Sequence, residues 1–344
     1  MTAPTALKLK FRTAAEICKD TGVIAWLLHP FLEQNSSGIM FGELGTFKSI
    51  LALDWALRVA TGAPGPDGKK ADPRPVIYLS AEGRGLSKRI RGWAKRHLGS
   101  VEALAGVPFL AIERPVNLSS KDAVQEIISA MEAMGLVPAL IIIDTVSRNS
   151  DGKVEGSTDD ATQYLNTIDS ELRARYGACV LFVHHVGHLE RHRARGPYVF
   201  MSNTDASFLV ERPDRAKRLI RVTTGRLKDS ESPPPLELEG MVVELDELDE
   251  AGKPVTTLVL EPTGRAAKEP IRRPSGKQQL SLLEAIESRQ QPLGAESVIS
   301  SDEIKAVCET LRLHRNTTRE ATNALVKSGF LVTTAGGYRL GDGQ

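Results

Sequence analysis

The chain has 344 residues, enough for one large domain and a second, smaller one. Its 44 lysines and arginines nearly balance 43 aspartates and glutamates, and the net charge of +1 excludes a strongly basic protein that binds polyanions over its whole surface. Hydrophobic residues make up 41% and charged residues 25% of the chain, a composition that excludes wholesale disorder.

Cysteine usage and hydropathy indicate the compartment. The three cysteines (Cys18, Cys179 and Cys308) are far apart and odd in number, so they predict neither a disulfide framework nor a metal-ligand pair. Residues 1–12 lack the apolar core of a secretory signal, and no run of about 18 uncharged apolar residues occurs. We therefore expect a cytoplasmic protein without a membrane-spanning segment.

Short apolar segments alternate with amphipathic ones through the first two thirds of the chain. The apolar segments are typical of strands in a parallel sheet that helices cover on both faces. They are residues 38–41, 76–79, 139–143, 178–183 and 206–210. Helical periodicity occurs between them, at residues 49–60, 86–97, 121–134 and 159–175. This alternation predicts an α/β fold with a mostly parallel, doubly wound sheet.

The pattern changes after Leu219. Strands with alternating hydrophobicity, at residues 219–223, 236–245 and 256–260, predict an antiparallel edge on the parallel sheet. A segment rich in proline, glycine and charge follows, and it is interpreted as a linker. The predicted organisation is an N-terminal segment at 1–36, a core domain at 37–261, a linker at 262–277 and a C-terminal domain at 278–344.

The C-terminal region reads as three short helices and a hairpin. The helices are expected at residues 280–288, 302–310 and 317–328, and the hairpin at 329–340 with its turn at 335–337. This order predicts a winged helix-turn-helix, whose second motif helix would present polar and basic side chains to duplex DNA. The candidates are Arg315, Asn316 and Arg319. A protein-binding module is the alternative.

A phosphate-binding pattern stands between the first strand and the first helix. Residues 42–49 (Gly-Glu-Leu-Gly-Thr-Phe-Lys-Ser) match the P-loop pattern G-x-x-x-x-G-K-[ST], except that Phe47 replaces the second specified glycine. Backbone N–H groups of such a loop bind phosphate oxygens, the lysine neutralises their charge and the serine hydroxyl ligates Mg²⁺. The candidate ATP-binding residues are Gly42, Gly45, Thr46, Phe47, Lys48, Ser49 and Ile50. A tight turn with a surface lysine and serine is the alternative.

Polar residues at the ends of three later strands extend this site. Asp144 is expected to hold Mg²⁺ together with Ser49, although an aspartate after a strand can also simply form a turn. Glu82 is a candidate base for the attacking water, or an acid that complements a helix dipole. His184 and His185 point to opposite faces of their strand and are a poor metal pair. One of them could reach a phosphate while the other packs, and we assign His185 to the phosphate.

In their order along the chain, these motifs resemble the RecA-fold P-loop ATPases of plasmids and phages, of which the RepA-type hexameric replicative helicases are the best-known members. The matching pieces are residues 42–49 (Walker A), 79–82, 143–148 (Walker B), 183–187 and 193–205, within a resemblance that covers about residues 24–245. The resemblance implies a RecA-like core that hydrolyses ATP with Mg²⁺ at the subunit interfaces of a homo-oligomer, a hexameric ring, and that binds single-stranded DNA. The C-terminal winged helix would be an addition to this core.

The resemblance also implies two further groups of site residues. Arg226 and Lys228 would act on the γ-phosphate of a neighbouring subunit, although their order is reversed from the Lys-x-Arg of related helicases and a charged turn is the alternative. Arg191, Arg193 and Arg195 would follow a single-strand backbone, or belong to a solvated surface loop. Two rival functions stay open, an ATP-controlled DNA-binding regulator and a helicase loader or recombination mediator without unwinding activity.

Overall fold

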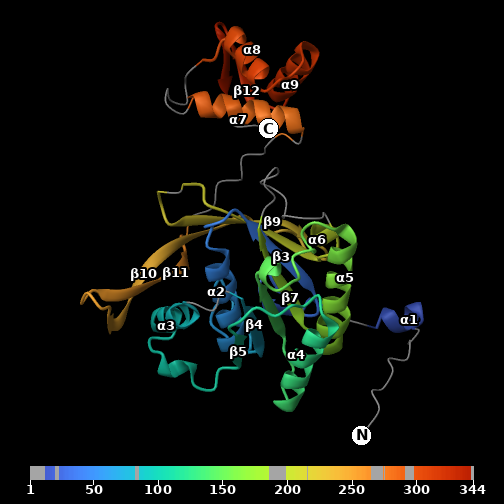
Figure 1. The fold of residues 1–344 in the computed structure, drawn as a ribbon, viewed down its shortest axis with the longest axis vertical. Coiled ribbons are helices and arrows are strands. Elements are labelled where there is room, and N and C mark those ends of the chain that lie inside the picture. The colour runs from blue at the N-terminus through green and yellow to red at the C-terminus, as the bar shows by residue number, and fades with distance from the viewer. Residues whose placement is uncertain are drawn as a thin grey trace. The chain divides into compact units, whose positions relative to one another are not determined.

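Figure 1 shows the fold of the chain as a computed structural model. It describes residues 12–19, 23–81, 85–185, 199–214, 216–264, 274, 276–290 and 298–341. The chain divides into two compact units, Met1–Ala267 and Lys268–Gln344. Every helix in the described parts is too short or too polar to span a lipid bilayer.

A single twisted sheet forms the centre of the larger unit. Over the described residues it has nine strands, in the order β11-β10-β9-β8-β3-β7-β6-β4-β5. Six neighbouring strands run parallel: β8 (Ala206–Glu211), β3 (Ser37–Gly42), β7 (Cys179–His185), β6 (Leu140–Asp144), β4 (Val76–Ser80) and β5 (Phe109–Ile112). Three antiparallel strands continue beyond β8: β9 (Leu219–Leu227), β10 (Leu236–Leu248) and β11 (Pro254–Pro262). The predicted α/β class, with a mostly parallel sheet and an antiparallel edge, is confirmed.

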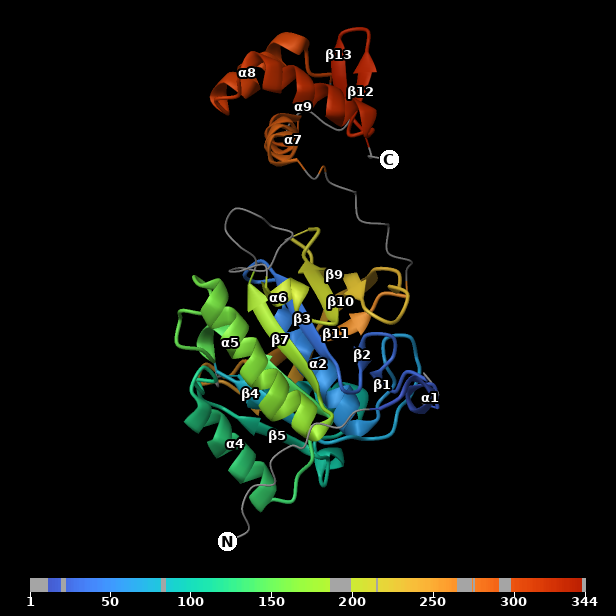
Figure 2. The same ribbon diagram turned by 90° about the vertical axis from the view of Figure 1, so that its right-hand side faces the viewer.

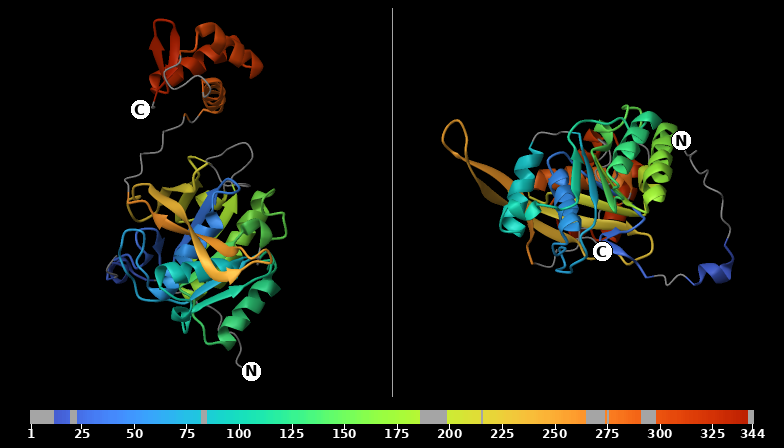
Figure 3. Two further views of the ribbon diagram at one scale, coloured as in Figure 1. Left: turned by 90° about the vertical axis from the view of Figure 1, so that its left-hand side faces the viewer. Right: turned by 90° about the horizontal axis from the view of Figure 1, so that it is seen from below.

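Helices cover both faces of this sheet. Helices α2 (Lys48–Thr61) and α3 (Leu86–His97) lie on one face, and α4 (Lys121–Ala133) and α5 (Thr158–Ile168) on the other (Figures 1 and 3). The strands are apolar on both sides because each face has its own core: Met40 packs with α2, whereas its neighbour Ile39 packs with α4 and α5. Both side chains are fully buried.

Several short elements are absent from the sequence-based prediction. Helix α1 (Ala14–Ile17) precedes the hairpin β1 (Trp26–Leu28) and β2 (Leu32–Glu33), and α6 (Val199–Ser202) precedes β8. Strand β5 was missed because its side chains are only partly buried at the sheet edge, so that its pattern is weak. The helix predicted at 159–175 is also more complex: α5 ends at Ile168 and a π-helical turn continues it over Asp169–Ala174. Single 3-10 turns lie at Glu102–Leu104 and Val146–Arg148.

The smaller unit contains α7 (Lys277–Gln290), α8 (Ser301–Thr310) and α9 (Arg315–Lys327), followed by β12 (Leu331–Thr334) and β13 (Gly337–Leu340) (Figure 2). Leu282, Ile286 and Leu325 are buried in a core that these elements share. The three helices and the antiparallel hairpin occur in the expected order. The predicted three-residue turn is shorter, because Gly337 already belongs to β13.

Candidate nucleotide site

The P-loop connects the carboxyl end of β3 to the start of α2 at the edge of the sheet where the six parallel strands end (Figure 2). Gly42 closes β3 and Lys48 opens α2, so the loop turns within residues 43–47. Gly45 has a left-handed backbone with a φ of +79°, which a glycine adopts without strain. The loop therefore has a helix N-terminus behind it, the position from which backbone N–H groups bind phosphate.

Phe47 occupies the position at which the P-loop pattern specifies glycine, and its backbone is also left-handed, with φ 62° and ψ 23°. Such a conformation costs an ordinary residue about 1–2 kcal/mol. The sequence departs from the pattern here while the backbone keeps the shape that glycine normally provides. Contacts of the phenylalanine ring, described below, offset this cost.

The Lys48 side chain folds back over the loop. It is 5% exposed, and its ammonium group donates hydrogen bonds to the carbonyl oxygens of Gly42 (2.9 Å) and Glu43 (2.7 Å) and to the Thr46 hydroxyl (3.4 Å). Burial lowers the pKa of Lys48 to about 8, and the charges of Asp144 and Glu43 partly oppose this shift. Lys48 thus provides a desolvated positive charge inside the loop.

Ser49 and Asp144 meet although 95 positions separate them in the sequence. The Ser49 hydroxyl donates to Asp144 Oδ1 at 3.0 Å, and the Tyr78 hydroxyl donates to Asp144 Oδ2 at 2.7 Å. Asp144 ends β6 and is 6% exposed, so both hydrogen bonds stabilise a buried carboxylate. The sequence pattern contains no signal for Tyr78, because its role depends on the pairing of β4 with β6.

These oxygens suit a magnesium ion in part. Hydroxyl and carboxylate oxygens are the ligands that Mg²⁺ prefers, and it is commonly held by one or two carboxylates together with substrate phosphates. Among the described residues, no group of three or more His, Cys, Asp or Glu side chains could hold a metal ion by itself. The donors present therefore fit an ion that the protein and a bound nucleotide hold jointly.

Arg212 also contacts the loop, and sequence analysis did not identify it. It directly follows β8, and its guanidinium carbon lies 4.6 Å from the centroid of the Phe47 ring. Its Nη1 donates to the Gly45 carbonyl oxygen at 3.3 Å, and its Nη2 donates to the Lys217 carbonyl oxygen at 2.9 Å. A cation over an aromatic ring stabilises by about 0.5–2 kcal/mol, which is comparable to the cost of the left-handed Phe47 backbone.

The two histidines are the last two residues of β7. His185 ends β7 beside Gly42, its partner in the sheet register, and is partly buried. His184 is fully buried, and its Nδ1 lies 3.8 Å from Glu155 Oε1. As the alternation of a strand requires, the two side chains point to opposite faces. Of the two, His185 is the one that stands beside the P-loop in the register.

Several candidate residues lie outside the described part of the chain. They are the predicted base Glu82 and the basic residues Arg191, Arg193 and Arg195. Strand β4, which precedes Glu82 in the sequence, ends at Ser80 beside Asp144, and the Ala81 N–H donates to the Asp144 carbonyl oxygen at 2.9 Å. Strand β4 therefore ends at the site edge of the sheet, two residues before Glu82 in the sequence.

Arg226 and Lys228 lie at the other end of the sheet. Between them, Leu227 pairs with Ala206 at the start of β8, level with the start of β3. Both basic side chains are exposed, and Lys228 Nζ lies 3.5 Å from Asp205 Oδ1. The structure therefore does not bring them to the P-loop of their own chain.

The DNA-binding candidates of the smaller unit lie at the start of α9. Asn316 and Arg319 are exposed, and the side chain of Arg315 lies outside the description. Helix α9 begins after His314 without a side-chain cap. These positions keep polar groups at the helix start available for a partner.

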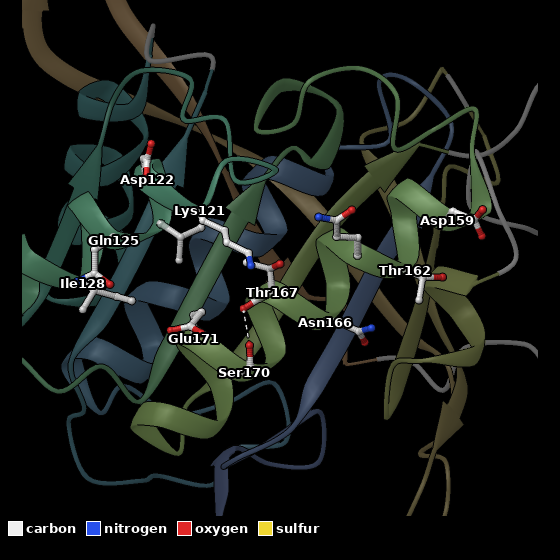
Figure 4. Close-up of a pocket in the computed structure, with 12 residues that line it drawn as sticks. Lys121, Asp122, Gln125, Ile128, Asp159, Thr162, Asn166, Thr167, Ser170 and Glu171 are labelled. Atoms are coloured by element: carbon white, nitrogen blue, oxygen red, sulfur yellow. Dashed lines mark hydrogen bonds between the residues drawn. The ribbon is translucent and has the colours of Figure 1, made fainter. Parts of the chain in front are cut away.

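A polar groove of about 630 Å³ lies away from the P-loop, between α4 and α5 (Figure 4). Lys121 and Gln125 line one side and Thr162, Asn166 and Glu171 the other. None of the residues of the phosphate loop contributes to its lining. The P-loop site and this groove are therefore two separate sites.

Comparison with known proteins gives three results. A family model described as an AAA domain matches residues 3–191. No curated protein matches the chain. Among solved structures, the RadB recombinase is 14% identical, with 61% of this chain and 88% of that chain covered and a TM-score of 0.41. The ATPase domain of a second protein is 13% identical, with 65% of this chain and 91% of that chain covered and a TM-score of 0.46.

Proposed function

The chain belongs to the AAA domain family, and on that premise we propose that it is an ATPase that works as an oligomer on DNA, a translocase or helicase similar to the RepA type. One observation carries the ATPase part: buried Lys48 folds over the P-loop while Ser49 and Asp144 are hydrogen-bonded 3.0 Å apart beside it. A cation next to a hydroxyl–carboxylate pair at a helix N-terminus suits a triphosphate with its metal ion.

Lys48 would bind the β- and γ-phosphates. Its present partners are carbonyl oxygens of the loop, and phosphate oxygens would replace them as acceptors. In a desolvated site this charge acts more strongly on the phosphates than it would in water. Ser49 and Asp144 would hold magnesium, which neutralises phosphate charge when bound. Tyr78 would keep the carboxylate oriented through its 2.7 Å hydrogen bond.

Hydrolysis then requires an attacking water and stabilisation of the developing charge. A base, for which Glu82 is our candidate, would accept a proton from water as the oxygen bonds to the γ-phosphorus. The bond from that phosphorus to the bridging oxygen breaks, which releases ADP and phosphate. His185, beside Gly42 in the register, would contact the γ-phosphate side of the site. Arg226 and Lys228 of another copy would stabilise the transition state.

The smaller unit supports the DNA part of the proposal. Its three helices and hairpin have the order of a winged helix-turn-helix, and exposed Asn316 and Arg319 stand at the start of α9. These side chains suit phosphate or base contacts. Arg191, Arg193 and Arg195 would contribute contacts to single-stranded DNA in the larger unit.

Steady-state ATP hydrolysis with and without single-stranded DNA tests the proposal. We expect stimulation by single strands and loss of all hydrolysis above background in Lys48→Ala, with Lys121→Ala, a lysine of the separate groove, as the matched control. No hydrolysis by the wild-type chain would contradict the ATPase. Hydrolysis without any response to single strands would contradict the translocase.

The second candidate function is an ATP-controlled regulator that binds duplex DNA. The exposed polar start of α9 favours it, because this position reads duplex DNA in helix-turn-helix proteins. It predicts sequence-specific duplex binding that is lost when Asn316 and Arg319 are both replaced by alanine, without stimulation by single strands. Binding of a labelled random-sequence duplex pool, followed by sequencing of the retained fraction, separates the two functions.

A further inference from the structure

Phe47 is a bulky residue at a position of the P-loop where the backbone is left-handed. It has no side-chain capping bond at the start of α2. Its ring packs on the edge of the hydrophobic core between the sheet and α2. The loop therefore keeps its shape without the freedom that a glycine would provide at this position.

Arg212 reaches the loop from a different part of the sheet. Strand β8 runs parallel to β3, so both strands end at the same edge. The ends of the two strands lie close together, since a Cβ atom at Gly42 would be only 2.1 Å from the carbonyl oxygen of Val210. Arg212 follows two residues after Val210 and is thereby placed beside the loop.

The guanidinium group joins the P-loop to the turn that follows β8. It lies over the Phe47 ring at 4.6 Å and donates to the Gly45 carbonyl oxygen at 3.3 Å. Its second terminal nitrogen donates to the Lys217 carbonyl oxygen at 2.9 Å, which ties the group to its own turn. A planar cation with donors on both sides can make these contacts at the same time, whereas a lysine cannot.

We infer that Arg212 is a positioning residue of the phosphate site, which holds Phe47 in its left-handed conformation and so maintains the phosphate-binding shape of a P-loop that lacks the expected glycine. Arg212 acts on the nucleotide through Phe47 and not through a direct contact. This inference rests on the proposed ATP site. Nucleotide binding, rather than the chemical step, is the property that Arg212 controls.

A double-mutant cycle between positions 212 and 47 tests this role. The dissociation constant of a fluorescent ATP analogue with Mg²⁺ is measured for the full-length wild type, Arg212→Ala, Phe47→Gly and the double variant. We expect Arg212→Ala to weaken binding roughly fivefold to tenfold in the wild-type background. In the Phe47→Gly background the same change should cost less than about twofold, because glycine adopts the left-handed backbone unaided.

Two further variants separate the role of Arg212 from general effects. Arg212→Lys keeps the charge but loses the planar contact, so binding should weaken nearly as much as in Arg212→Ala. Arg114→Ala, at an exposed arginine paired with Glu126 at 3.5 Å, should bind like the wild type. The melting temperatures of the same four proteins of the cycle are also measured without nucleotide. Arg212→Ala should lower the melting temperature more in the wild-type background than in the Phe47→Gly background.

Two results of the binding cycle would overturn the positioning role of Arg212. Unchanged binding in Arg212→Ala overturns the inference. An equal loss in both backgrounds, with Arg212→Lys binding like the wild type, also overturns it, because the arginine would then act by charge alone. If the wild type binds no ATP, the proposed function fails instead. In that case the melting cycle still shows whether Arg212 supports Phe47, and equal melting shifts in both backgrounds overturn that support.

Discussion

At the scale of single residues, Lys48 combines two opposing requirements. In the proposed site it must be charged to bind phosphate, yet it is buried in its own loop, and this burial lowers its pKa to about 8. Carbonyl oxygens of Gly42 and Glu43 satisfy its donors in the absence of a ligand. Binding of an anion then exchanges these neutral acceptors for charged ones, which favours the protonated lysine.

This balance predicts how ATP binding depends on pH. A bound triphosphate raises the pKa of Lys48, so above about pH 8 the free protein must take up a proton in order to bind. Titration of Lys48 should leave the dissociation constant for ATP unchanged below about pH 8. Above that pH it should weaken binding by up to about tenfold per pH unit. Calorimetry at several pH values, in buffers of different ionisation enthalpy, measures both the affinity and the proton uptake.

Lys48→Arg provides the matched control, because an arginine stays charged over the whole range. The ATP affinity of the Lys48→Arg variant should therefore not fall between about pH 7 and 9.5, because its arginine does not lose its proton there. A wild-type affinity that is equally independent of pH would contradict the assignment of the depressed pKa to the binding lysine.

At the scale of elements, a buried polar network joins the P-loop helix α2 to α3. Asp54 of α2 accepts hydrogen bonds from Arg58 Nε and from Trp93 Nε1 of α3, both at 2.8 Å. Arg58 also donates to the Pro64 carbonyl oxygen. His97 lies 3.9 Å from Asp54, and burial together with the positive charge of Arg58 lowers the pKa of this histidine. Helix α3, whose start follows the Glu82 segment, is thereby held on α2.

Removing one charge from this network should be costly. Asp54→Ala leaves Arg58 buried without its carboxylate, and we expect the larger unit to lose about 3–5 kcal/mol of unfolding free energy. Urea unfolding followed by tryptophan fluorescence measures this loss. All three tryptophans of the chain (Trp26, Trp55 and Trp93) are in the larger unit, so the signal reports that unit alone.

Asp169→Ala is the corresponding control. Asp169 pairs with Arg173 at the same helical spacing of four residues, but its side chain is 51% exposed. An exposed pair of this kind contributes about 0–1 kcal/mol. Equal losses in the two variants would show that burial of the Asp54 pair does not determine its energy.

At the scale of the whole molecule, the geometry of the sheet separates the P-loop from Arg226 and Lys228, the residues proposed to act in trans. Leu227, between Arg226 and Lys228, is level with the start of β3, whereas the P-loop follows its end. Through Ala206, Leu227 is level with Gly38, and a strand rises about 3.3 Å per residue, so the four steps from Gly38 to Gly42 place Leu227 roughly 13 Å from the end of β3 along the strand direction. This separation supports the proposal that Arg226 serves a phosphate site on another copy of the chain.

Mixing two inactive variants tests this arrangement. Lys48→Ala removes the lysine proposed to bind the phosphates, and Arg226→Ala removes the arginine proposed to act in trans. Each variant alone should hydrolyse almost no ATP. In randomly mixed oligomers at equal amounts, about one site in four combines an intact Lys48 with an intact Arg226 from the neighbouring copy, so activity should recover to about a quarter of the wild-type value. No recovery, although mixed oligomers are shown to form, would contradict action in trans.

Local patterns in the sequence were sufficient to predict most of the elements and to propose the P-loop. Buried strands and amphipathic helices carry their own periodicities, and strand, loop and helix stand in an unbroken order from Gly38 to Ala60. For that reason the α/β sheet with its antiparallel edge could be predicted, and Lys48, Ser49 and Asp144 could be proposed together. Strand β5 and the π-helical turn after α5 could not, because edge exposure and local helix geometry leave weak signals.

The tertiary structure alone decided which distant residues meet at that loop. Tyr78 reaches Asp144 because β4 pairs with β6, and Arg212 reaches Phe47 because β8 lies beside β3. The depressed pKa of Lys48 likewise depends on burial by the folded loop. A local pattern specifies how a segment folds, whereas these contacts and this burial arise from strand order, which brings together residues that carry no shared signal in the sequence.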